Sequence, residues 1–449
     1  MEKRDTICAI STPVGKGGIA VARISGREAK VISEHHLCSL KGKAVTLHDR
    51  RAKVCRLCDG YDFVDEVVVI FFAAPHSYTG EDVVEISCHG SLYVQERLLR
   101  LLCDGGARMA EPGEFTLRAF LNGRLNLSQA EAVADLIDSQ SKASHGLAVS
   151  QMRGGYAREL EELRQQFVDL AALLELELDF SDEEVEFADR RRIRDTVNAL
   201  KQKVSRLIDS FRMGNAIKNG VPVAIVGAPN AGKSSLLNAL LREDRAIVSP
   251  VPGTTRDTVE ETLSIDGIMF RFIDTAGLRD SDDSIEKLGI ERSRKAIEKA
   301  QIVIVVHDVS AGPDEEAEAM FADVSQTDRI ILLVHNKCDL VLPPYPDGLT
   351  VSAKTGLGVD ELKQSMIKAF REKMTDQGDV LLTNARHYEA MGKVLSALIE
   401  VEKGMDSELP TDLMVIDIRD ALYHLGTITG KVTSDEVLSS VFSRFCIGK

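Results

Sequence analysis

The sequence lacks any long uninterrupted hydrophobic run. No apolar stretch in its 449 residues reaches the roughly 18 residues that a bilayer span requires. The opening residues, MEKRDTICAI, are too polar for a secretory signal, so we expect a cytoplasmic protein with no membrane anchor. Hydrophobic residues make up 44% and charged residues 28% of the chain, which excludes a disordered or collagen-like protein.

Positive charge is also in short supply. The chain has 55 Lys and Arg against 70 Asp and Glu, a formal net charge of -15. This balance argues against broad non-specific nucleic-acid binding, which is driven by counterion release from phosphates. Residues 1–125 carry 17 basic and 16 acidic side chains, so the excess negative charge lies in the rest of the chain. A local basic site is compatible with this distribution.

Cysteine pairs at metal-binding spacing are scarce. Cys55 and Cys58 form one C-x-x-C pair, and His48 is the only histidine close to it. Because a zinc site usually needs a second pair or nearby histidines, we favour reduced thiols over a zinc site. Cys446 stands where a prenylation site would lie, but the tail CIGK ends in Lys, which fits that modification poorly.

Proline is absent from residues 113–221, so this stretch is free of the strongest helix breaker. Apolar residues recur there at helical spacing in three segments, and the same pattern returns after about residue 376. The sequence therefore predicts long amphipathic helices that pack together. The segments are 127–140, 160–180, 194–211, 387–405 and 410–430.

Two other parts of the chain show strand patterns. In residues 1–120, Val- and Ile-rich strands at 64–74 and 81–90 precede a helix at 91–107, which predicts an α+β domain. From about residue 216, apolar runs alternate with helical stretches, which predicts a parallel sheet covered on both faces. These runs are 221–227, 269–277, 301–308 and 329–336.

The chain length suggests about three domains. We predict a multidomain α/β protein in which an α/β domain is inserted into an all-helical domain, so that helices before and after the insertion form one bundle. The predicted boundaries are 1–122 for the N-terminal α+β domain, 123–215 and 376–449 for the two parts of the helical domain, and 216–375 for the insertion.

A phosphate-binding motif opens the predicted insertion. Residues 227–234 read GAPNAGKS, which fits G-x-x-x-x-G-K-[ST] with a strand before it and a helix after it. Backbone N–H groups and the helix N-terminus should hold the phosphates. Lys233 should reach the β- and γ-phosphates, and the Ser234 hydroxyl should hold magnesium.

Three further motifs select GTP over ATP. DTAG (274–277) closes a strand, so that Asp274 would hold magnesium through water and the N–H of Gly277 would sense the γ-phosphate. In NKCD (336–339), Asp339 can accept from the guanine ring N–H and amine, a donor pair that adenine lacks. SAK (352–354) suits the guanine carbonyl oxygen. All lie at carboxyl ends of strands, where ligands bind in such sheets.

The residue that orients the attacking water in Ras-like enzymes is missing. The position that carries Gln there is Leu278 in this chain. The loop that follows offers several polar side chains, and composition does not choose among them; a charged switch loop is the simpler interpretation. The candidates are Arg279, Asp280, Asp282, Asp283 and Glu286.

Motifs along the whole chain resemble one GTPase family. VPGTTRD (251–257) resembles the TrmE–Era–EngA branch, in which the equivalent of Thr255 completes the magnesium shell. The segments 5–26, 79–90 and 111–137 and the final FCIGK are similar to the MnmE family, also called TrmE, of tRNA modification GTPases. The resemblance implies these GTP-binding residues: Asn230, Ala231, Gly232, Lys233, Ser234, Ser235, Ser249, Thr254, Thr255, Asp274, Thr275, Ala276, Gly277, Asn336, Lys337, Asp339, Ser352, Ala353 and Lys354.

The resemblance also implies a role in modifying carbon 5 of the wobble uridine of certain tRNAs. The family forms a homodimer and a heterotetramer with the FAD-dependent partner MnmG. It adds an aminomethyl or carboxymethylaminomethyl group, using a one-carbon unit carried by 5-formyl-tetrahydrofolate or 5,10-methylenetetrahydrofolate. By this resemblance Arg23, Glu81, Arg124 and Lys449 bind folate. The family often has Lys in place of Arg124, and an ordinary ion pair between Arg23 and Glu81 is the alternative.

The family pattern supplies the missing catalytic groups. Potassium replaces an arginine finger, held by Asn230 and by oxygens of Ser249, Val251 and Thr254, as two GTPase domains pair. Glu286 orients the attacking water through a bridging water. The pattern also makes Cys446 a candidate nucleophile toward uridine, although a C-terminal Cys is more often incidental.

Two other functions stay open from the sequence. One is a GTP-switched binding protein for ribosome assembly of the Era or EngA type, for which an RNA-binding module with a GXXG loop would be expected. We find no such module in the sequence. The other is a folate-binding enzyme that its GTPase domain only regulates.

Overall fold

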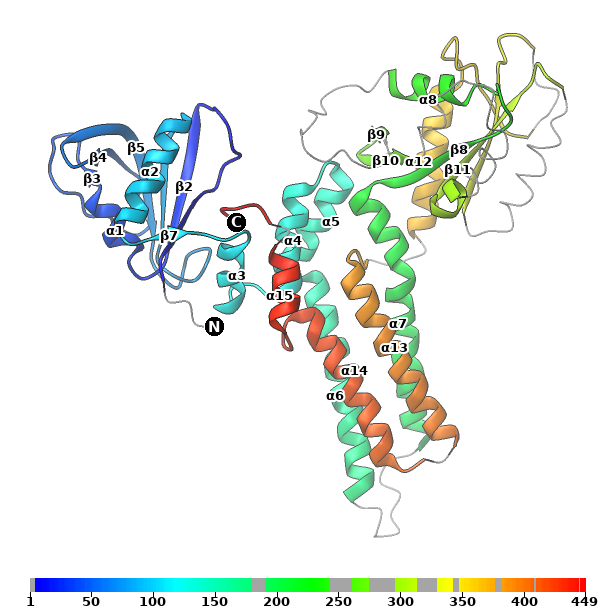
Figure 1. The fold of residues 1–449 in the computed structure, drawn as a ribbon. Helices are drawn as coiled ribbons and strands as arrows, with labels where there is room; N and C mark the ends of the chain where they lie inside the picture. The colour runs from blue at the N-terminus through cyan, green and yellow to red at the C-terminus, as the bar shows by residue number, and fades with distance from the viewer. Residues whose placement is uncertain are drawn as a thin grey trace. The chain divides into compact units, whose positions relative to one another are not determined.

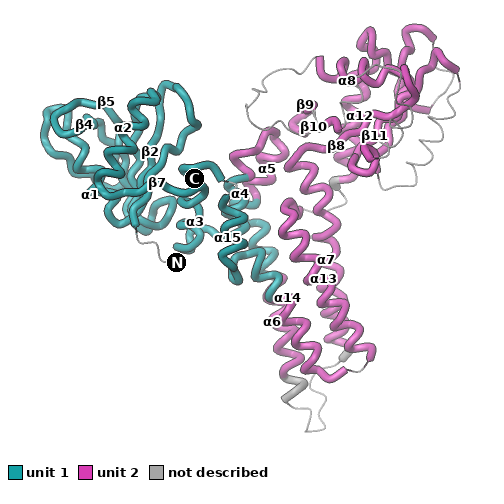
Figure 2. The backbone as a smooth tube through the Cα atoms, in the orientation of Figure 1, with its two compact units in different colours: residues 1–134, 151–162, 423–449 teal, residues 135–150, 163–422 magenta. Residues whose placement is uncertain are grey.

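The computed structural model divides into two compact units (Figures 1 and 2). Unit 1 comprises residues 1–134, 151–162 and 423–449, and unit 2 comprises residues 135–150 and 163–422. The domain boundaries that we predict from the sequence stay a prediction. The structure describes residues 5–179, 190–242, 261–273, 295–312, 329–341, 347–375, 381–407, 409–443 and 445–449. Across these ranges, no helix combines the length and the apolar character that crossing a membrane demands.

The N-terminal part of unit 1 is a seven-stranded sheet of order β3-β4-β5-β6-β2-β1-β7. Only the β1–β7 pair is parallel. Helices α1 (Ala29–His35) and α2 (Leu92–Asp104) accompany it, which confirms the predicted α+β pattern. The strands are β1 (Ile7–Ile10), β2 (Ile19–Ser25), β3 (Leu37–Cys38), β4 (Lys53–Asp59), β5 (Asp62–Phe72), β6 (Val83–His89) and β7 (Arg108–Met109).

Alternating burial explains why this sheet forms. In β5, Val67, Val69 and Phe71 are buried, while the residues between them are exposed or half-buried. One face of the sheet is therefore apolar and packs in a core that also contains Leu98 and Leu102 of α2. The helix ends at Asp104, with Gly105 as its C-cap, within the predicted range 91–107.

Long helices pair before and after the inserted domain. Within unit 2, α7 packs along α13, and ion pairs join Lys201 to Glu402 and Arg194 to Asp406. Arg419 of α14 pairs with Glu175 of α6. The predicted packing between the two helical segments is thus confirmed. The helices are α3 (Glu114–Leu121), α4 (Leu127–Asp138), α5 (Lys142–Met152), α6 (Gly155–Asp179), α7 (Arg190–Asn219), α13 (Ala385–Asp406), α14 (Thr411–Thr429) and α15 (Asp435–Phe442).

The inserted domain is built on a six-stranded sheet of order β13-β12-β11-β8-β10-β9. In the central strands, alternate residues enter two separate cores: Val223 and Ile304 lie in one, and Ala224 and Val303 in the other. Both faces are buried, which explains the continuous apolar runs. The elements are β8 (Val221–Val226), α8 (Lys233–Arg242), β9 (Glu261–Ile265), β10 (Ile268–Phe272), β11 (Ile302–Asp308), β12 (Ile330–Asn336), β13 (Leu349–Thr350) and α12 (Val359–Thr375).

The sheet departs from the predicted all-parallel pattern at one edge. Strand β9 runs antiparallel to β10. The two strands are joined by Asp266 and Gly267, whose φ angles of 49° and 79° suit a tight hairpin turn. A two-residue connection cannot reverse the chain into a parallel pair. With this correction, the predicted fold class is confirmed: a multidomain α/β protein with an inserted α/β domain.

Candidate functional site

The phosphate-binding motif lies between β8, which ends at Val226, and α8, which begins at Lys233. Gly227 has a φ of 147°, and a Cβ there would lie 2.2 Å from the carbonyl oxygen of Val306. Gly232 has a φ of 93°, and a Cβ there would lie 2.2 Å from the Asn336 amide nitrogen. Both positions therefore require glycine. This is the strand–loop–helix arrangement that the motif predicts.

The Lys233 side chain folds over this loop. Its Nζ donates to the carbonyl oxygens of Gly227 at 2.9 Å and Ala228 at 2.8 Å. Burial lowers the pKa of Lys233 below its usual value. Phosphate oxygens beside the ammonium group would favour its charged form and oppose this shift. The Lys233 ammonium group is thus held beside the loop, where it can interact electrostatically with an anionic ligand.

Asn336, the first residue of NKCD, connects two loops. It is buried, and its Nδ2 donates to the carbonyl of Ala231 at 2.9 Å. Its Oδ1 accepts from the backbone N–H of Ala353 at 3.0 Å. Both sides of the amide are used, so one side chain fixes the phosphate loop against the SAK loop.

Asp339 is oriented by the SAK loop. Ser352 Oγ donates to Asp339 Oδ1 at 2.7 Å, and the same hydroxyl accepts from the Thr355 N–H at 3.2 Å. The Asp339 residue is exposed, and its Ser352 contact engages Oδ1. A carboxylate held in this way can accept the paired ring N–H and amine of guanine, which is the chemistry that the sequence predicts.

Asp308 is a residue of this region that the sequence reasoning missed. It accepts from Lys337 Nζ and from the N–H and hydroxyl of Ser310. Burial raises the pKa of Asp308, but the hydrogen bonds from Lys337 and Ser310 outweigh it, and the net pKa is lowered. The sequence did offer a signal for Asp308: it is an acidic residue at the end of the apolar run that forms β11. In the sheet it lies opposite Asn336, the first residue of NKCD.

The other predicted nucleotide residues divide into two groups. Asn230 has a φ of 63°, Ser234 and Ser235 lie in the first turn of α8, and Lys354 ends the SAK motif. The second group falls outside the residues that the structure describes. It consists of Ser249, Val251, Thr254, Thr255, Asp274, Thr275, Ala276, Gly277 and Glu286.

A second cluster of predicted residues forms around β2. Arg23 donates to Glu85 Oε1 through Nε at 3.0 Å and Nη2 at 2.8 Å. Its guanidinium lies 5.1 Å from the centre of the Tyr78 ring. The alternative of an Arg23–Glu81 ion pair is therefore wrong, because Glu85 lies opposite Arg23 in the β2–β6 register.

Glu81 has other partners. Its Oε2 accepts from Ser25 Oγ at 2.8 Å and from Arg118 Nη1 at 3.1 Å. Arg118 is buried and was not among the predicted residues. The Arg124 side chain lies against Gly80, where a Cβ would be 3.2 Å from its Cγ. The Arg124 stem thus packs on Gly80, next to Glu81 in the chain, while Arg118 pairs with the Glu81 carboxylate.

The C-terminal tail docks on the same sheet. Ser11 Oγ donates to the carbonyl of Gly448 at 3.1 Å, and Arg23 Nη1 reaches the same oxygen at 3.4 Å. Burial, and then the positive charge of Arg23, lower the pKa of Lys449. Cys446 is exposed within this tail. Arg23 thus lies close to Lys449, and Cys446 belongs to the same tail; their roles in folate binding and in uridine chemistry stay predictions.

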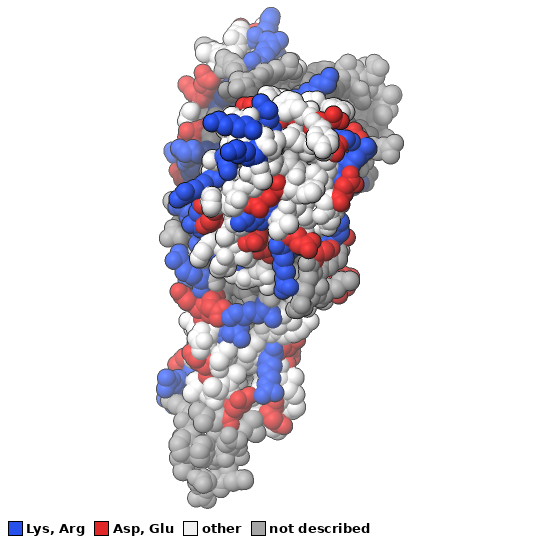
Figure 3. Space-filling view, turned by 90° about the vertical axis from the view of Figure 1, so that its left-hand side faces the viewer, with Lys and Arg blue, Asp and Glu red and all other residues white. Residues whose placement is uncertain are grey.

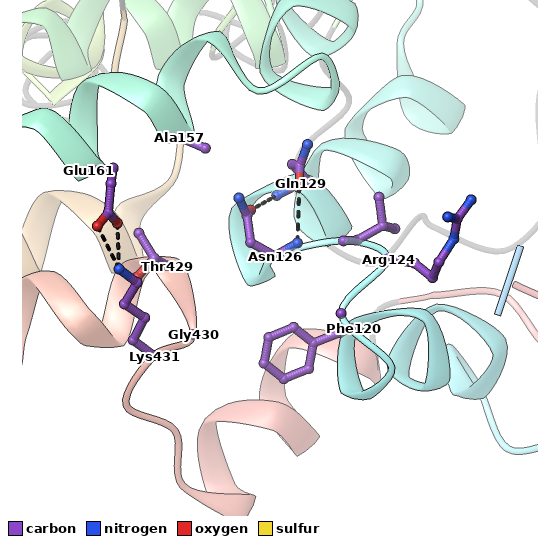
Figure 4. Close-up of a pocket in the computed structure, with 11 residues that line it drawn as sticks. Phe120, Arg124, Asn126, Gln129, Ala157, Glu161, Thr429, Gly430 and Lys431 are labelled. Carbon is purple, nitrogen blue, oxygen red and sulfur yellow. Dashed lines mark hydrogen bonds and ion pairs between the residues drawn. The ribbon is translucent and has the colours of Figure 1, made fainter. Parts of the chain in front are cut away.

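A cavity of about 410 Å³ in unit 1 has Arg124 among the residues that line it (Figure 4). Asn126 and Gln129 lie on one side of it, where the Asn126 N–H donates to Gln129 Oε1 at 3.1 Å. An ion pair between Lys431 and Glu161 lies on the other side, with Nζ–oxygen distances of 2.7 and 2.6 Å. In the close-up, Arg124 points away from this ion pair. The Lys431 charge is thus engaged by Glu161.

Two family models match the chain over most of its length. The family model described as the MnmE helical domain matches residues 127–446, and that described as the GTP-binding protein TrmE N-terminus matches residues 6–124. The chain belongs to the MnmE family. The chain is therefore a member of a family of tRNA modification GTPases.

Full-length relatives agree with this assignment to the MnmE family. The protein named tRNA modification GTPase MnmE from Cytophaga hutchinsonii is 48% identical over 452 residues, covering 99% of this chain and 98% of the relative. That from Parabacteroides distasonis is 48% identical over 460 residues, covering 99% and 100%. That from Flavobacterium psychrophilum is 46% identical over 458 residues, covering 99% of each.

Proposed function

We propose that this chain is a potassium-stimulated GTPase that modifies carbon 5 of the wobble uridine of certain tRNAs. It acts with an FAD-dependent partner of the MnmG type and adds an aminomethyl or carboxymethylaminomethyl group. The one-carbon unit comes from 5-formyl-tetrahydrofolate or 5,10-methylenetetrahydrofolate. The observation that carries this proposal is the joining of the phosphate loop and the guanine loops through Asn336, in a chain of the MnmE family.

The described residues fit a guanine nucleotide. Gly227 and Gly232 let the loop backbone approach a phosphate closely, and Lys233 supplies its positive charge. Asp339, oriented by Ser352, would read guanine. Ser234 and Thr255 would hold magnesium, which neutralises charge on the β- and γ-phosphates.

The proposed catalytic groups work around the γ-phosphate. Asn230, Ser249, Val251 and Thr254 would coordinate potassium, which supplies the positive charge that an arginine finger supplies elsewhere. Glu286 would orient the attacking water through a second water. Pairing of two GTPase domains in a homodimer would exclude bulk solvent from the γ-phosphate.

The cluster around β2 is the proposed folate site. Arg23 and Lys449 would hold the anionic part of the folate, and Glu81 would accept hydrogen bonds from its pterin ring. Arg124, against Gly80, would add a further cation. Bound folate supplies the one-carbon unit. Cys446 is exposed in the docked tail, where its sulfur could attack the uridine ring.

The proposed assembly is a cytoplasmic heterotetramer. Two copies of this chain pair through the N-terminal domain, residues 1–122, and two MnmG-type partners carry FAD. The helical domain, 123–215 and 376–449, would link that domain to the GTPase domain, 216–375. tRNA is the shared substrate.

Mass analysis of tRNA nucleosides tests this function. Cells that lack the protein should lose the carbon-5 modification of wobble uridines, and the intact gene should restore it. A Lys233→Ala copy should not restore it, because nucleotide binding would fail. Unchanged wobble uridines in the deletion strain would reject the proposal and would favour a GTP-switched protein of ribosome assembly.

A further inference from the structure

Three cysteines lie on two neighbouring strands at one edge of the N-terminal sheet. Cys38 ends β3, and Cys55 and Cys58 lie in β4. The strands are antiparallel, with Leu37 opposite Leu57, and β3 is the edge strand. The Sγ atoms of Cys38 and Cys58 are 3.0 Å apart. Ordinary non-bonded carbon atoms stay about 3.5–4.0 Å apart, so these two side chains already point directly at each other.

Solvent exposure and strand register distinguish the Cys38–Cys58 pair from Cys55. Cys38 and Cys58 are half-buried, so a small oxidant can reach them. Cys55 forms the C-x-x-C spacing with Cys58, but its side chain is fully buried in the sheet core. The register of β4 against β5 shifts between Leu57 and Cys58, which changes the direction of Cys58 relative to the residues before it.

We propose that Cys38 and Cys58 form a reversible disulfide that clips the edge strand β3 to β4. One cysteine thiolate attacks a low-molecular-weight disulfide such as glutathione disulfide, and one glutathione thiolate leaves. The second cysteine thiolate attacks the protein-side sulfur of the mixed disulfide and releases the second glutathione thiolate. The protein pair loses two electrons, glutathione disulfide gains them, and the two cysteine protons end on the two glutathione thiols.

The chain contains an internal comparison pair. Cys8 and Cys103 have their Sγ atoms 3.8 Å apart. Cys8 is fully buried, and burial raises its pKa far above the usual range for a thiol. Because Cys8 is shielded from a small oxidant and its sulfur lies farther from its neighbour than in the first pair, this second pair should resist the oxidant that closes the first.

The closing reaction should accelerate with rising pH. Burial, together with the neighbouring Cys38 thiol, raises the pKa of Cys58 to about 11. At neutral pH the Cys58 thiol keeps its proton, so exchange is slow there even where the disulfide is favoured at equilibrium. The bridge would close a loop across a sequence separation of 20 residues and restrain the chain between the two strands.

Equilibration of the full-length chain in glutathione buffers of graded oxidised-to-reduced ratio tests the proposal. Free thiols are then blocked with N-ethylmaleimide, and the digested peptides are mapped by mass spectrometry. The Cys38 and Cys58 peptides should appear linked, and dithiothreitol should separate them. The Cys8 and Cys103 peptides should stay blocked, and Cys446 should carry only glutathione.

Two variants sharpen the result. In Cys38→Ser, Cys58 should form a mixed disulfide with glutathione, whereas Cys88→Ser should leave the Cys38–Cys58 link intact. Oxidation should also raise the thermal unfolding temperature of wild type, because the link forms there. The same oxidation should leave the unfolding temperature of Cys38→Ser unchanged. Full blocking of both Cys38 and Cys58 at ratios that glutathionylate Cys446 would overturn the proposal. A Cys55–Cys58 link would overturn it too.

Discussion

An ion network joins strand β7 to helix α3 in unit 1. Glu114 accepts from Arg108 Nη1 at 2.8 Å and from Arg118 Nη2 at 3.1 Å. Glu114 and Arg118 are both buried. Burial raises the pKa of Glu114, but the hydrogen bonds from Arg108, the Glu111 N–H and Arg118 outweigh it, so the net pKa is lowered. The folded state thus binds a proton on Glu114 less readily than the unfolded chain.

We expect Glu114→Gln to destabilise the N-terminal domain at neutral pH by about 3 kcal/mol, because it leaves the buried Arg118 guanidinium and the half-buried Arg108 guanidinium underpaired. A carboxyl whose folded pKa is depressed stabilises the fold above its unfolded pKa, here 4.5, and loses that effect as pH falls through the folded value. The difference between variant and wild type should therefore shrink in acid. Hydrogen exchange of α3 and β1 amides, corrected for intrinsic rates, measures it.

Glu96→Gln is the matched control for this prediction. The Glu96 side chain is 75% exposed and pairs with Arg100 across one helical turn. Its loss should cost less than about 0.5 kcal/mol. Equal protection of α3 in wild type and Glu114→Gln would show that the network does not stabilise the domain.

Asn230 is the residue on which the potassium proposal can be tested. GTP hydrolysis should be about tenfold or more faster in potassium than in sodium at matched ionic strength. Asn230 has a left-handed φ of 63°, which Asn tolerates better than Ala. Asn230→Gly is therefore the better variant, since it keeps the backbone and removes the amide. It should bind GTP and lose the preference for potassium, and Asn230→Ala should lose it too. Equal wild-type rates in the two salts would refute potassium catalysis.

At the scale of elements, the C-terminal tail completes the N-terminal sheet. Gly448 has a φ of 98°, and a Cβ there would lie 2.3 Å from the carbonyl oxygen of Ile10. Upstream, α15 packs on α3, and Phe442 and Phe445 share a core with Leu127. The tail is therefore fastened by a helix on one side and by a close backbone contact on the other.

Gly448→Ala should release the tail from β1, because the added methyl has no room and the φ is strained. The affinity for 5-formyl-tetrahydrofolate should fall about tenfold or more, equal to ~1.4 kcal/mol, because Lys449 leaves Arg23. Isothermal titration measures this affinity. Gly392→Ala, in α13 with open space around its Cβ position, should leave affinity unchanged. Undiminished affinity in Gly448→Ala would remove Lys449 from the proposed site.

Elements with a strong local signal could be predicted from the sequence. The strands β8, β11 and β12 follow from apolar runs, and Gly227 and Gly232 follow from the phosphate-binding motif. Strand β9 has no such apolar run. Its antiparallel pairing with β10 is set by the two-residue turn between the two strands. Glu85 and Arg118 could not be found in advance, because their partners Arg23 and Glu81 come from distant segments and only the folded domain brings them together.

At the scale of the whole molecule, charge is unevenly distributed along the chain. Residues 1–125 are close to neutral, with 17 basic and 16 acidic side chains, and the rest carries the excess of negative charge. On the face drawn in Figure 3, Lys and Arg are interspersed with Asp and Glu. This pattern suits local recognition of a ligand better than broad attraction of a polyanion.

We therefore expect the chain alone to bind tRNA weakly, with a dissociation constant of about 10⁻⁴–10⁻⁶ M and a shallow salt dependence. Adding a basic MnmG-type partner should tighten binding and steepen the dependence on salt. Filter binding or fluorescence anisotropy over a series of salt concentrations measures both. Tight binding of tRNA without the partner would contradict the proposed division of phosphate contacts.

The docking of the tail on the first strands has a consequence for protein synthesis. The hydrogen bond between Ser11 and Gly448 joins residues 437 positions apart. At typical elongation rates, the ribosome makes the second partner roughly 20 to 90 seconds after the first. During that interval, the surface of the nascent sheet around Ser11 and Arg23 lacks the C-terminal segment that covers it in the finished protein. Chains that terminate early can fold most of their domains and still lack this last contact, so a ligand of the β2 cluster would distinguish finished chains from truncated ones.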